Sequence, residues 1–179
     1  DNIVRRRPDL SFGLLRDFYR PLKPVPKGRL KVALTLVDWG ESSEAGRTAY
    51  VDALSGFFIQ LSRSHVVSID VLPQVPYGPQ AYEALFGLFE RRVRGHVAGI
   101  DFVQEKLSVE QLMARYASAD ILVGTRMHSV IFSWCAGTPA MGIAYDAGAK
   151  WSILGDLGVD AFVFSIESVT ADQLVEGFR

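Results

Sequence analysis

The sequence has few of the residues that build disulfides and metal centres. Its 179 residues include one cysteine, Cys135, and three histidines. A single cysteine excludes a disulfide within the chain and fits a reducing compartment. The apolar helical pattern around Cys135 predicts a buried structural thiol rather than a nucleophile. The three histidines, His65, His96 and His128, lie on separate predicted elements without the spacing of zinc ligands, so we expect no metal and no cofactor.

Long hydrophobic runs, an excess of charge and the common nucleotide and hydrolase motifs are also lacking. No apolar run reaches the ~18–20 residues of a membrane span, and no signal peptide is recognisable. The net charge of −1 gives no overall signal for nucleic acid. The chain contains no Gly-x-Gly-x-x-Gly after its first predicted strand, no P-loop and no Gly-x-Ser-x-Gly elbow. Dinucleotide-binding and serine-hydrolase readings therefore have no support.

The beginning of the chain differs from the rest. The first residue is Asp1 rather than methionine, so we expect the natural chain to begin earlier. Three of the eight prolines fall between Pro21 and Gly28. Proline can neither continue a helix nor donate to a strand ladder, so this stretch is interpreted as a stiff linker.

From Leu30 onward, strand-like and helix-like segments alternate about six times. This alternation is typical of an α/β fold, a Rossmann-like parallel sheet of about six strands with helices on both faces. The predicted strands are 30–37, 65–73, 96–103, 119–125, 139–145 and 161–166. The predicted helices are 43–63, 79–95, 108–118, 127–137, 149–158 and 170–178. Ligands of such sheets bind at the carboxyl ends of the strands, which directs attention to the residues that follow each strand.

The strongest candidate site is the junction between the predicted strand 119–125 and the helix after it. Arg126 offers a planar, permanently charged fork that suits carboxylate or phosphate. His128 offers the side chain most easily poised for proton transfer near neutrality. The backbone around Thr125 and Met127 and the positive end of the helix dipole point at the same spot. The pattern predicts a bound anion with a proton donor beside it. The competing interpretation pairs Arg126 with a neighbouring carboxylate and places His128 in the core.

Two other strand ends carry candidate binding residues. Tyr145, Asp146 and Lys150 follow the predicted strand 139–145, next to the first candidate site if the strands are neighbours. Lys150 would supply a second cation, Tyr145 a wall or a hydroxyl, and Asp146 would orient His128 or hold a sugar hydroxyl. A surface loop explains these residues equally well.

Asp38 and Trp39 follow the first strand, and an aromatic ring beside a carboxylate is a common way to bind a sugar. Packing of Trp39 against the next helix is the alternative.

The segment "SADILVGTRMHSVIFSWCAGTPAMGIAYDAGAKWSILGDLGVD" resembles the C-terminal signature of the polysaccharide pyruvyl transferase family. The matching residues are Ala119-Asp120, Arg126 and His128, Gly137 and Pro139, Tyr145-Asp146, Lys150 and Leu157-Gly158. A looser likeness in element order covers most of the chain. The resemblance implies the C-terminal half of a two-domain, GT-B-like enzyme. Residues 1–28 are then the tail of a missing N-terminal domain and the interdomain linker, and residues 29–179 are a Rossmann-like donor-binding domain.

The resemblance also implies an activity. Enzymes of this family transfer the pyruvyl group of phosphoenolpyruvate onto a sugar of a cell-surface polysaccharide or its precursor as a ketal, and phosphate leaves. Arg126 and Lys150 would hold the donor's anionic groups, and His128 would protonate its enol carbon. The implied partners are phosphoenolpyruvate and a sugar or glycan acceptor, with no nucleic acid. Because the N-terminal domain is missing, we expect no turnover from this chain alone.

Two alternatives stay open at this point. A GT-B glycosyltransferase that uses a nucleotide sugar shares the Ala-Asp strand, the helix and the Gly-x-Pro turn. Such enzymes usually place a carboxylate in that helix, and the segment from Met127 to Ala136 has none. A non-catalytic domain that binds a glycan or a partner is the second alternative. Its support is that Asp38 and Trp39 stand where several relatives carry an arginine after the first strand. For the location we expect the cytoplasm, with association to a membrane through a lipid-linked acceptor as a variant.

Overall fold

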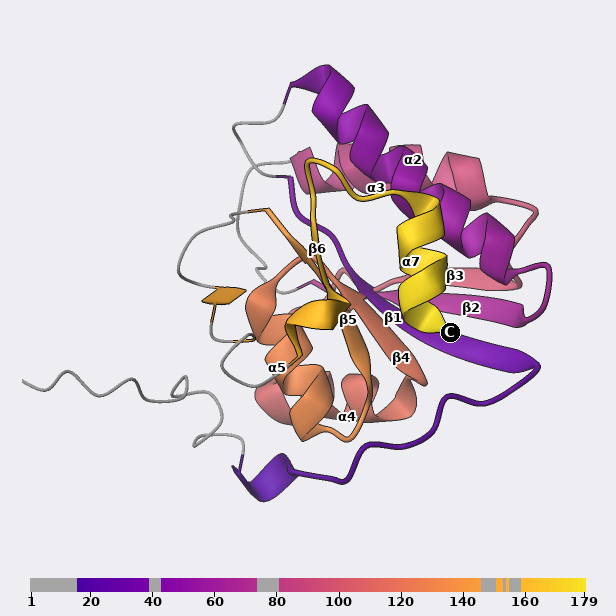
Figure 1. Cartoon of the computed structure of the whole chain (residues 1–179). Coiled ribbons are helices and arrows are strands. Elements are labelled where there is room, and N and C mark those ends of the chain that lie inside the picture. The colour runs from indigo at the N-terminus through magenta and orange to yellow at the C-terminus, as the bar shows by residue number, and fades with distance from the viewer. Residues whose placement is uncertain (1–15, 39–42, 74–80, 146–150, 153, 155–158) are drawn as a thin grey trace, which may run out of the picture.

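The structure is a computed structural model that describes residues 16–38, 43–73, 81–145, 151–152, 154 and 159–179. Its centre is one sheet of six parallel strands in the order β3-β2-β1-β4-β5-β6 (Figure 1). The strands are β1 (Arg29–Thr35), β2 (Val66–Val71), β3 (Gly99–Phe102), β4 (Ile121–Gly124), β5 (Ala140–Ala144) and β6 (Val163–Ser165). The predicted fold class, a Rossmann-like parallel sheet of about six strands, is confirmed.

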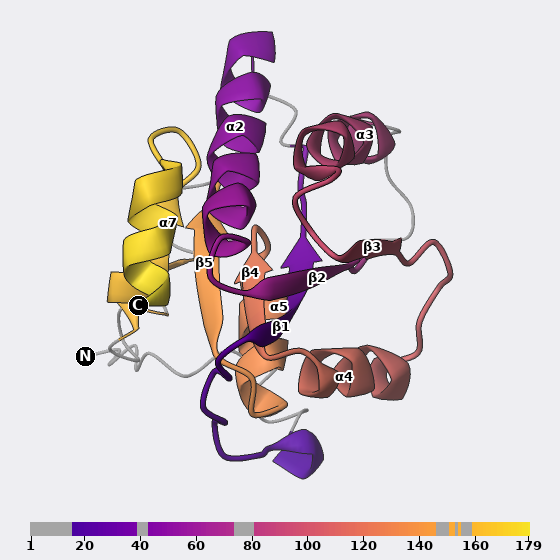
Figure 2. The ribbon, with the colours of Figure 1, turned by 90° about the vertical axis from the view of Figure 1, so that its right-hand side faces the viewer.

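Helices cover both faces of this sheet, as predicted. Figure 2 shows α2, α3 and α7 on one face and α4 on the other, where α5 packs beside α4. The α-helices are α2 (Glu44–Leu61), α3 (Ala81–Val93), α4 (Val109–Ser118), α5 (Met127–Cys135) and α7 (Ala171–Phe178). Two short 3-10 helices, η1 (Arg16–Phe18) and η2 (Asp160–Phe162), complete the elements. Of the predicted helix 149–158, only Trp151, Ser152 and Leu154 lie in the described residues, and all three are helical.

Local sequence signals explain where several helices begin. Ser108 and Thr170 each cap a helix, α4 and α7, and each takes part in a full capping box with the glutamine three residues later. The reciprocal bonds satisfy backbone N–H groups that the first helical turn leaves without partners.

The core has two layers, one on each side of the sheet. On the α2, α3 and α7 side, the rings of Phe57, Phe58 and Phe89 are fully buried and meet edge to face. On the α4 and α5 side, Tyr116, Ile131 and Leu122 are fully buried. Strands β4 and β5 are buried along their whole length because helices cover both of their faces.

The strand order reverses beside β1. Chain order runs outward from β1 through β2 to β3, and α4 then returns the chain to the other side of β1, where β4 lies. Thr35 at the end of β1 stands opposite Gly124 at the end of β4. The helix after β1 is α2 and the helix after β4 is α5, and these two helices lie on opposite faces. This is a topological switch point, the place where open α/β sheets bind ligands.

The proline-rich segment before β1 runs along the far end of α5. The backbone N–H of Arg20 donates to the carbonyl of Cys135 at 2.8 Å, and that of Lys23 donates to Gly137 at 2.9 Å. These bonds satisfy carbonyls at the C-terminal end of α5. Gly137 has a φ of 78°, and a side chain there would meet the carbonyl oxygen of Pro21 at 2.6 Å. The segment is thus packed against the domain rather than extended into solvent.

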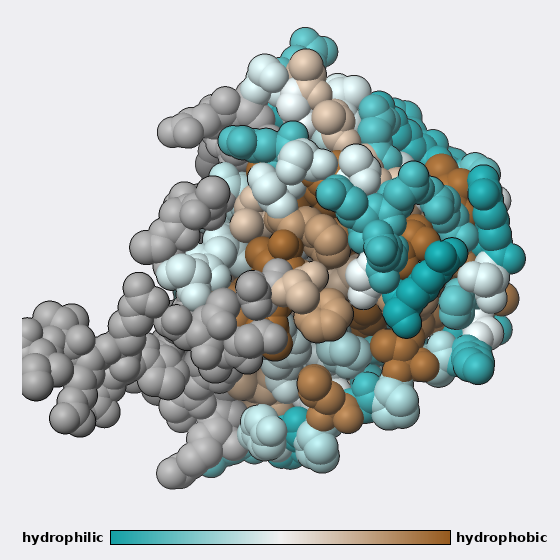
Figure 3. Space-filling view, in the orientation of Figure 1, coloured by the Kyte–Doolittle hydropathy of each residue, from teal (hydrophilic) through white to brown (hydrophobic). Residues whose placement is uncertain are grey.

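The outer surface carries scattered rather than gathered apolar residues. The exposed large hydrophobic side chains among the described residues are Tyr19 and Leu22 before β1, Val66 at the start of β2, Val109 at the start of α4 and Phe162 in η2. On the face drawn in Figure 3, hydrophilic residues predominate over α2 and α7. Single exposed apolar residues of this kind are normal for folded proteins.

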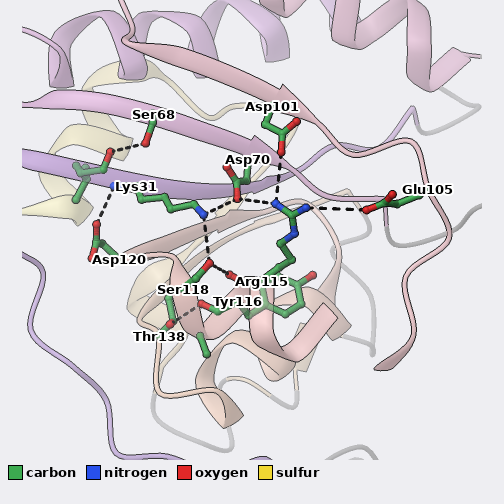
Figure 4. A network of polar contacts seen from close by, with 12 residues as sticks. Lys31, Ser68, Asp70, Asp101, Glu105, Arg115, Tyr116, Ser118, Asp120 and Thr138 are labelled. Carbon is green, nitrogen blue, oxygen red and sulfur yellow. Dashed lines mark hydrogen bonds and ion pairs between the residues drawn. The ribbon is translucent and has the colours of Figure 1, made fainter. Parts of the chain in front are cut away.

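A charged network lies on the α4 side of the sheet, around Asp70 of β2 (Figure 4). The Asp70 side chain is 10% exposed and lies 2.9 Å from Lys31 Nζ and 3.6 Å from Arg115 Nη1. Arg115 also reaches Asp101 at 3.4 Å. Asp70 Oδ2 has no partner with hydrogen-bond geometry in the described part of the chain, so this pairing is mainly coulombic. The network joins β1, β2, β3 and α4.

Substitution of Asp70 by asparagine should lower the free energy of unfolding by about 1–3 kcal/mol, because it leaves two cations without their shared counter-charge. The loss of stability is limited because the side chains of Lys31 and Arg115 are each 35% exposed, so water can partly solvate their charges. Urea unfolding would measure the change. The matched control is Glu90→Gln, which breaks the exposed ion pair between Glu90 of α3 and Arg94 just after that helix, and should change stability by about 0.5 kcal/mol or less. Equal losses in both variants would contradict the assignment.

Candidate functional site

The candidate site lies where β4 passes into α5, at the switch point of the sheet. Gly124 ends β4, and a side chain there would meet Ser129 Oγ at 2.7 Å, Leu122 Cδ2 at 3.1 Å and Val130 Cγ2 at 3.2 Å. The absence of a side chain at Gly124 therefore lets α5 begin directly against the strand end. Thr125 and Ser129 are fully buried, whereas Arg126 is half-buried and His128 is exposed. The tight turn thus presents two chemically active side chains at the surface.

Arg126 is the N-cap residue of α5. Its backbone is extended, with φ −124° and ψ 125°, and its side chain makes no capping bond. No described residue forms an ion pair or a hydrogen bond with its guanidinium group. The alternative in which Arg126 is neutralised by a neighbouring carboxylate therefore has no support from the described part of the chain. A half-buried guanidinium beside a helix N-terminus is suited to bind carboxylate or phosphate.

His128 lies in the first turn of α5 with its side chain exposed. Its ring centre is 6.3 Å from that of Phe132, one helical turn later, and the two rings are tilted by 57°. His128 is therefore no core histidine, which removes the competing interpretation of this residue. Met127, which lies between Arg126 and His128 in the sequence, is partly buried against the core on the α5 side. Residues Arg126 and His128 thus reach the surface while Met127 anchors the turn.

Asp38 is the described member of the pair that follows β1. Its carboxylate Oδ1 accepts a hydrogen bond from Arg47 Nε at 3.1 Å, and its side chain is 7% exposed. The structure thus gives Asp38 a role in joining the β1 end to α2, and ligand binding by Asp38 stays a prediction. Trp39 lies outside the described residues. Arg47, whose side chain is 40% exposed, adds a cation at this edge that the sequence patterns missed.

Tyr145 follows β5 and is partly buried against the core on the α2 and α7 side. Because β5 pairs with β4 and Gly124 stands opposite Gly142, Tyr145 comes after the neighbouring strand end. Asp146 and Lys150 lie outside the described residues, so their binding roles stay predictions. Trp151 is buried, and a side chain at Gly142 would meet its ring at 2.6 Å. The chain is thereby anchored on β5 directly after the predicted binding residues.

Other residues of the signature are structural. Asp120 lies just before β4, at the opposite edge of the sheet from Arg126. Its Oδ2 accepts a bond from the backbone N–H of Lys31 at 2.7 Å, and its own N–H donates to the carbonyl of Lys31 at 2.7 Å. These two hydrogen bonds fix the start of β4 beside β1. Cys135 is buried, as predicted, and burial raises the pKa of its thiol.

Two structural findings concern ligands and membranes. Within the described ranges, no group of three or more histidine, cysteine, aspartate or glutamate side chains is placed to hold a metal ion. No helix in the described part of the chain is both long and apolar enough to cross a membrane.

Comparison with protein families gives a match over most of the chain. The model of a family described as polysaccharide pyruvyl transferase matches residues 2–147. The chain belongs to the polysaccharide pyruvyl transferase family. The matched range includes Arg126 and His128, so both side chains at the switch point are part of the family's own domain. No curated protein matches the chain.

Solved structures similar to this family member are GT-B glycosyltransferases. An UDP-forming α,α-trehalose-phosphate synthase from Burkholderia xenovorans is 14% identical, with a TM-score of 0.51 over 98% of this chain and 39% of that chain. A structure described as apo OtsA is 11% identical, with a TM-score of 0.53 over 96% and 41%. At such identities the likeness shows the fold alone. The chain spans about two fifths of the length of these structures.

Proposed function

We propose that the protein containing this chain transfers the pyruvyl group of phosphoenolpyruvate to two hydroxyls of a sugar or glycan acceptor, and that this domain holds the donor. One observation carries the proposal. At the switch point of the sheet, a half-buried arginine with no carboxylate partner among the described residues stands two positions before an exposed histidine. Membership of the polysaccharide pyruvyl transferase family supports the same reading.

The chemistry needs an anion site and a proton donor. Phosphoenolpyruvate carries a carboxylate and a phosphate, which suit Arg126, the first turn of α5 and, as a prediction, Lys150. His128 gives a proton to the CH₂ carbon of the donor, and the neighbouring carbon becomes cationic. A first sugar hydroxyl attacks that carbon and gives its proton to the imidazole of His128, which restores the acid. A second hydroxyl then displaces phosphate, which leaves with the electrons of its C–O bond and takes the second hydroxyl's proton. The product is a cyclic ketal. No atom changes its oxidation state by exchange with an outside reagent, so the reaction needs no oxidant or reductant.

The rival donor is a nucleotide sugar. The structural neighbours include enzymes described as UDP-forming, but their likeness concerns the fold only. Helix α5 carries no carboxylate, so it offers no acceptor for the hydroxyls of a ribose or sugar. An opening turn with Arg126 and His128 favours a small anionic donor instead. Polysaccharide biosynthesis at the cell envelope and a cytoplasmic location belong to this proposal as the setting in which such a donor and acceptor meet.

Calorimetric titration of the full-length protein tests the donor. Phosphoenolpyruvate should bind saturably, and Arg126→Ala should weaken the binding by about 10- to 100-fold, the loss expected for hydrogen bonds to a charged group. Arg63→Ala is the matched control, since it removes the same charge from the exposed C-terminal end of α2, at the other edge of the sheet, and should leave the dissociation constant unchanged. Binding of a UDP-sugar without binding of phosphoenolpyruvate would overturn the proposal in favour of glycosyl transfer.

A further inference from the structure

Four buried hydroxyl groups lie beneath the turn that carries Arg126. Thr35, Tyr50, Thr125 and Ser129 are all fully buried. Thr35 Oγ1 lies 2.9 Å from Ser129 Oγ, and the hydroxyls of Tyr50 and Thr125 form a second hydrogen bond. Buried hydroxyls are unfavourable unless they find partners, and here each one does. We call these four residues the hydroxyl clamp.

The two bonds of the clamp cross the switch point. Thr35 ends β1, but its partner Ser129 lies on α5, the helix that follows β4. Thr125 follows β4, but its partner Tyr50 lies on α2, the helix that follows β1. The backbone adds a third link, because the N–H of Thr125 donates to the carbonyl of Thr35 at 3.0 Å. Each strand end is therefore tied to the helix that belongs to the other strand.

The clamp ends on the backbone of Arg126. Ser129 Oγ donates to the carbonyl oxygen of Arg126 at 2.6 Å, and the N–H of Ser129 donates to the same oxygen at 3.0 Å. The only hydroxyl proton of Ser129 is used in its bond to the Arg126 carbonyl. The hydroxyl of Thr35 must therefore be the donor in its bond to Ser129 Oγ. The order of donation is Thr35 to Ser129 to Arg126, and in a dry interior such chains reinforce each other.

The Ser129 hydroxyl makes the shortest bond to the Arg126 carbonyl, which also accepts a longer one from the N–H of Val130 at 3.4 Å. Arg126 has no side-chain capping bond, and its backbone is extended rather than helical. Together the three bonds to its carbonyl, from the Ser129 hydroxyl and from the N–H groups of Ser129 and Val130, set the direction in which its Cα–Cβ bond leaves the turn. If these positions served packing alone, valine could replace the threonines, phenylalanine the tyrosine and alanine the serine. Each fills a similar volume without burying a polar atom.

We propose that Thr35, Tyr50 and Ser129 are positioning residues that aim the Arg126 guanidinium at the anionic group of the donor. The proposal rests on the proposed function of Arg126 as the donor's anion ligand. The clamp acts through Arg126 and touches no substrate. A role confined to stability would lower the free energy of unfolding and leave donor affinity unchanged. A positioning role lowers affinity in every variant that removes one of its hydroxyls.

The test compares matched substitutions in the full-length protein. Thr35→Val removes one hydroxyl at constant shape, and Thr35→Ser keeps it. Tyr50→Phe removes the hydroxyl of the second bond. The dissociation constant for phosphoenolpyruvate should rise by about 2- to 10-fold in Thr35→Val and Tyr50→Phe, the range for a neutral hydrogen bond, and Thr35→Ser should restore it. Thr138→Val is the control, because Thr138 is equally buried but its hydroxyl bonds to Tyr116 and Ala119 at the far edge.

Two outcomes would overturn the clamp. The first is wild-type affinity in Thr35→Val and Tyr50→Phe, and the second is an equal loss of affinity in Thr138→Val. Hydrogen exchange of the amides from Thr125 to Val130 gives a readout without ligand. These amides should exchange faster in Thr35→Val than in Thr138→Val, and unchanged protection would reject the clamp. If wild-type protein does not bind phosphoenolpyruvate, the proposed function fails, and the exchange result still decides whether the clamp orders the turn.

Discussion

Replacement of His128 by alanine in the full-length protein should lower kcat by roughly 10²–10⁴-fold and leave the dissociation constant for phosphoenolpyruvate nearly unchanged. The reason is the separation of roles at the β4–α5 junction. In the proposed mechanism Arg126 carries the charge that holds the donor, whereas His128, an exposed imidazole in the first turn of α5, supplies the proton. Loss of the proton donor slows carbon protonation without removing the anion ligand.

The pH dependence gives a second, independent readout. A general acid must carry its proton, so activity falls as pH rises past the point at which the acid deprotonates. This alkaline limb of the kcat profile should be lost in His128→Ala. His128→Gln keeps a polar side chain of similar reach but cannot transfer a proton, and should resemble the alanine variant.

The matched control for this prediction is His96→Ala. His96 is also exposed, but it lies between α3 and β3, and that connection enters β3 at the amino-terminal edge of the sheet. Its loss should leave kcat and the pH profile unchanged. Near-normal turnover of His128→Ala would show that another group protonates the donor. Equal losses in both variants would point to a general effect on folding instead.

Alanine at Gly124 should lower the free energy of unfolding by about 1–3 kcal/mol, the usual range for overpacking a filled site. The new Cβ would lie 2.7 Å from Ser129 Oγ, 3.1 Å from Leu122 Cδ2 and 3.2 Å from Val130 Cγ2. None of the three neighbours is the far end of a long flexible side chain, so relief requires movement of α5 away from β4. The same movement would break the bond between Thr35 and Ser129 and turn Arg126 away from the donor.

Urea unfolding and donor titration on the same protein would check both effects. Gly99→Ala is the control, because Gly99 also lies in a strand but has nothing within 4 Å of the position of an added Cβ. That substitution should be neutral or slightly stabilising, since alanine reduces the freedom of the unfolded chain. If Gly124→Ala matched Gly99→Ala in stability and in donor affinity, tight contact of α5 with β4 would not constrain the site.

Local patterns were sufficient for the elements and for the choice of the candidate site. Alternating strand and helix signals predicted six parallel strands, because each element's hydrophobic period depends only on its own residues. The capping boxes of Ser108 and Thr170 are equally local features, because each spans only four residues. Arg126 and His128 were found for the same reason: both belong to one strand–helix junction.

Only the tertiary structure placed Asp38 with Arg47. They are nine positions apart with a helix start between them, and neither residue departs from what a polar loop or a helix surface would carry. The sequence suggested a sugar ligand at Asp38, which stays a prediction, and the fold adds the contact of its carboxylate with Arg47 of α2. A similar limit applies to Asp120, which the signature contains but which fixes the backbone of β1 at the opposite edge.

The hydroxyl clamp shows this limit most clearly. Its two side-chain bonds join residues 94 and 75 positions apart, and they exist because β4 returns to lie beside β1. Strand order depends on non-local pairing, which leaves no mark in the periodicity of any single segment. The sequence by itself determined that an arginine and a histidine open a helix after a buried strand. The tertiary structure decided that this opening lies at the switch point, with Thr35 and Tyr50 brought beneath it from the other half of the sheet.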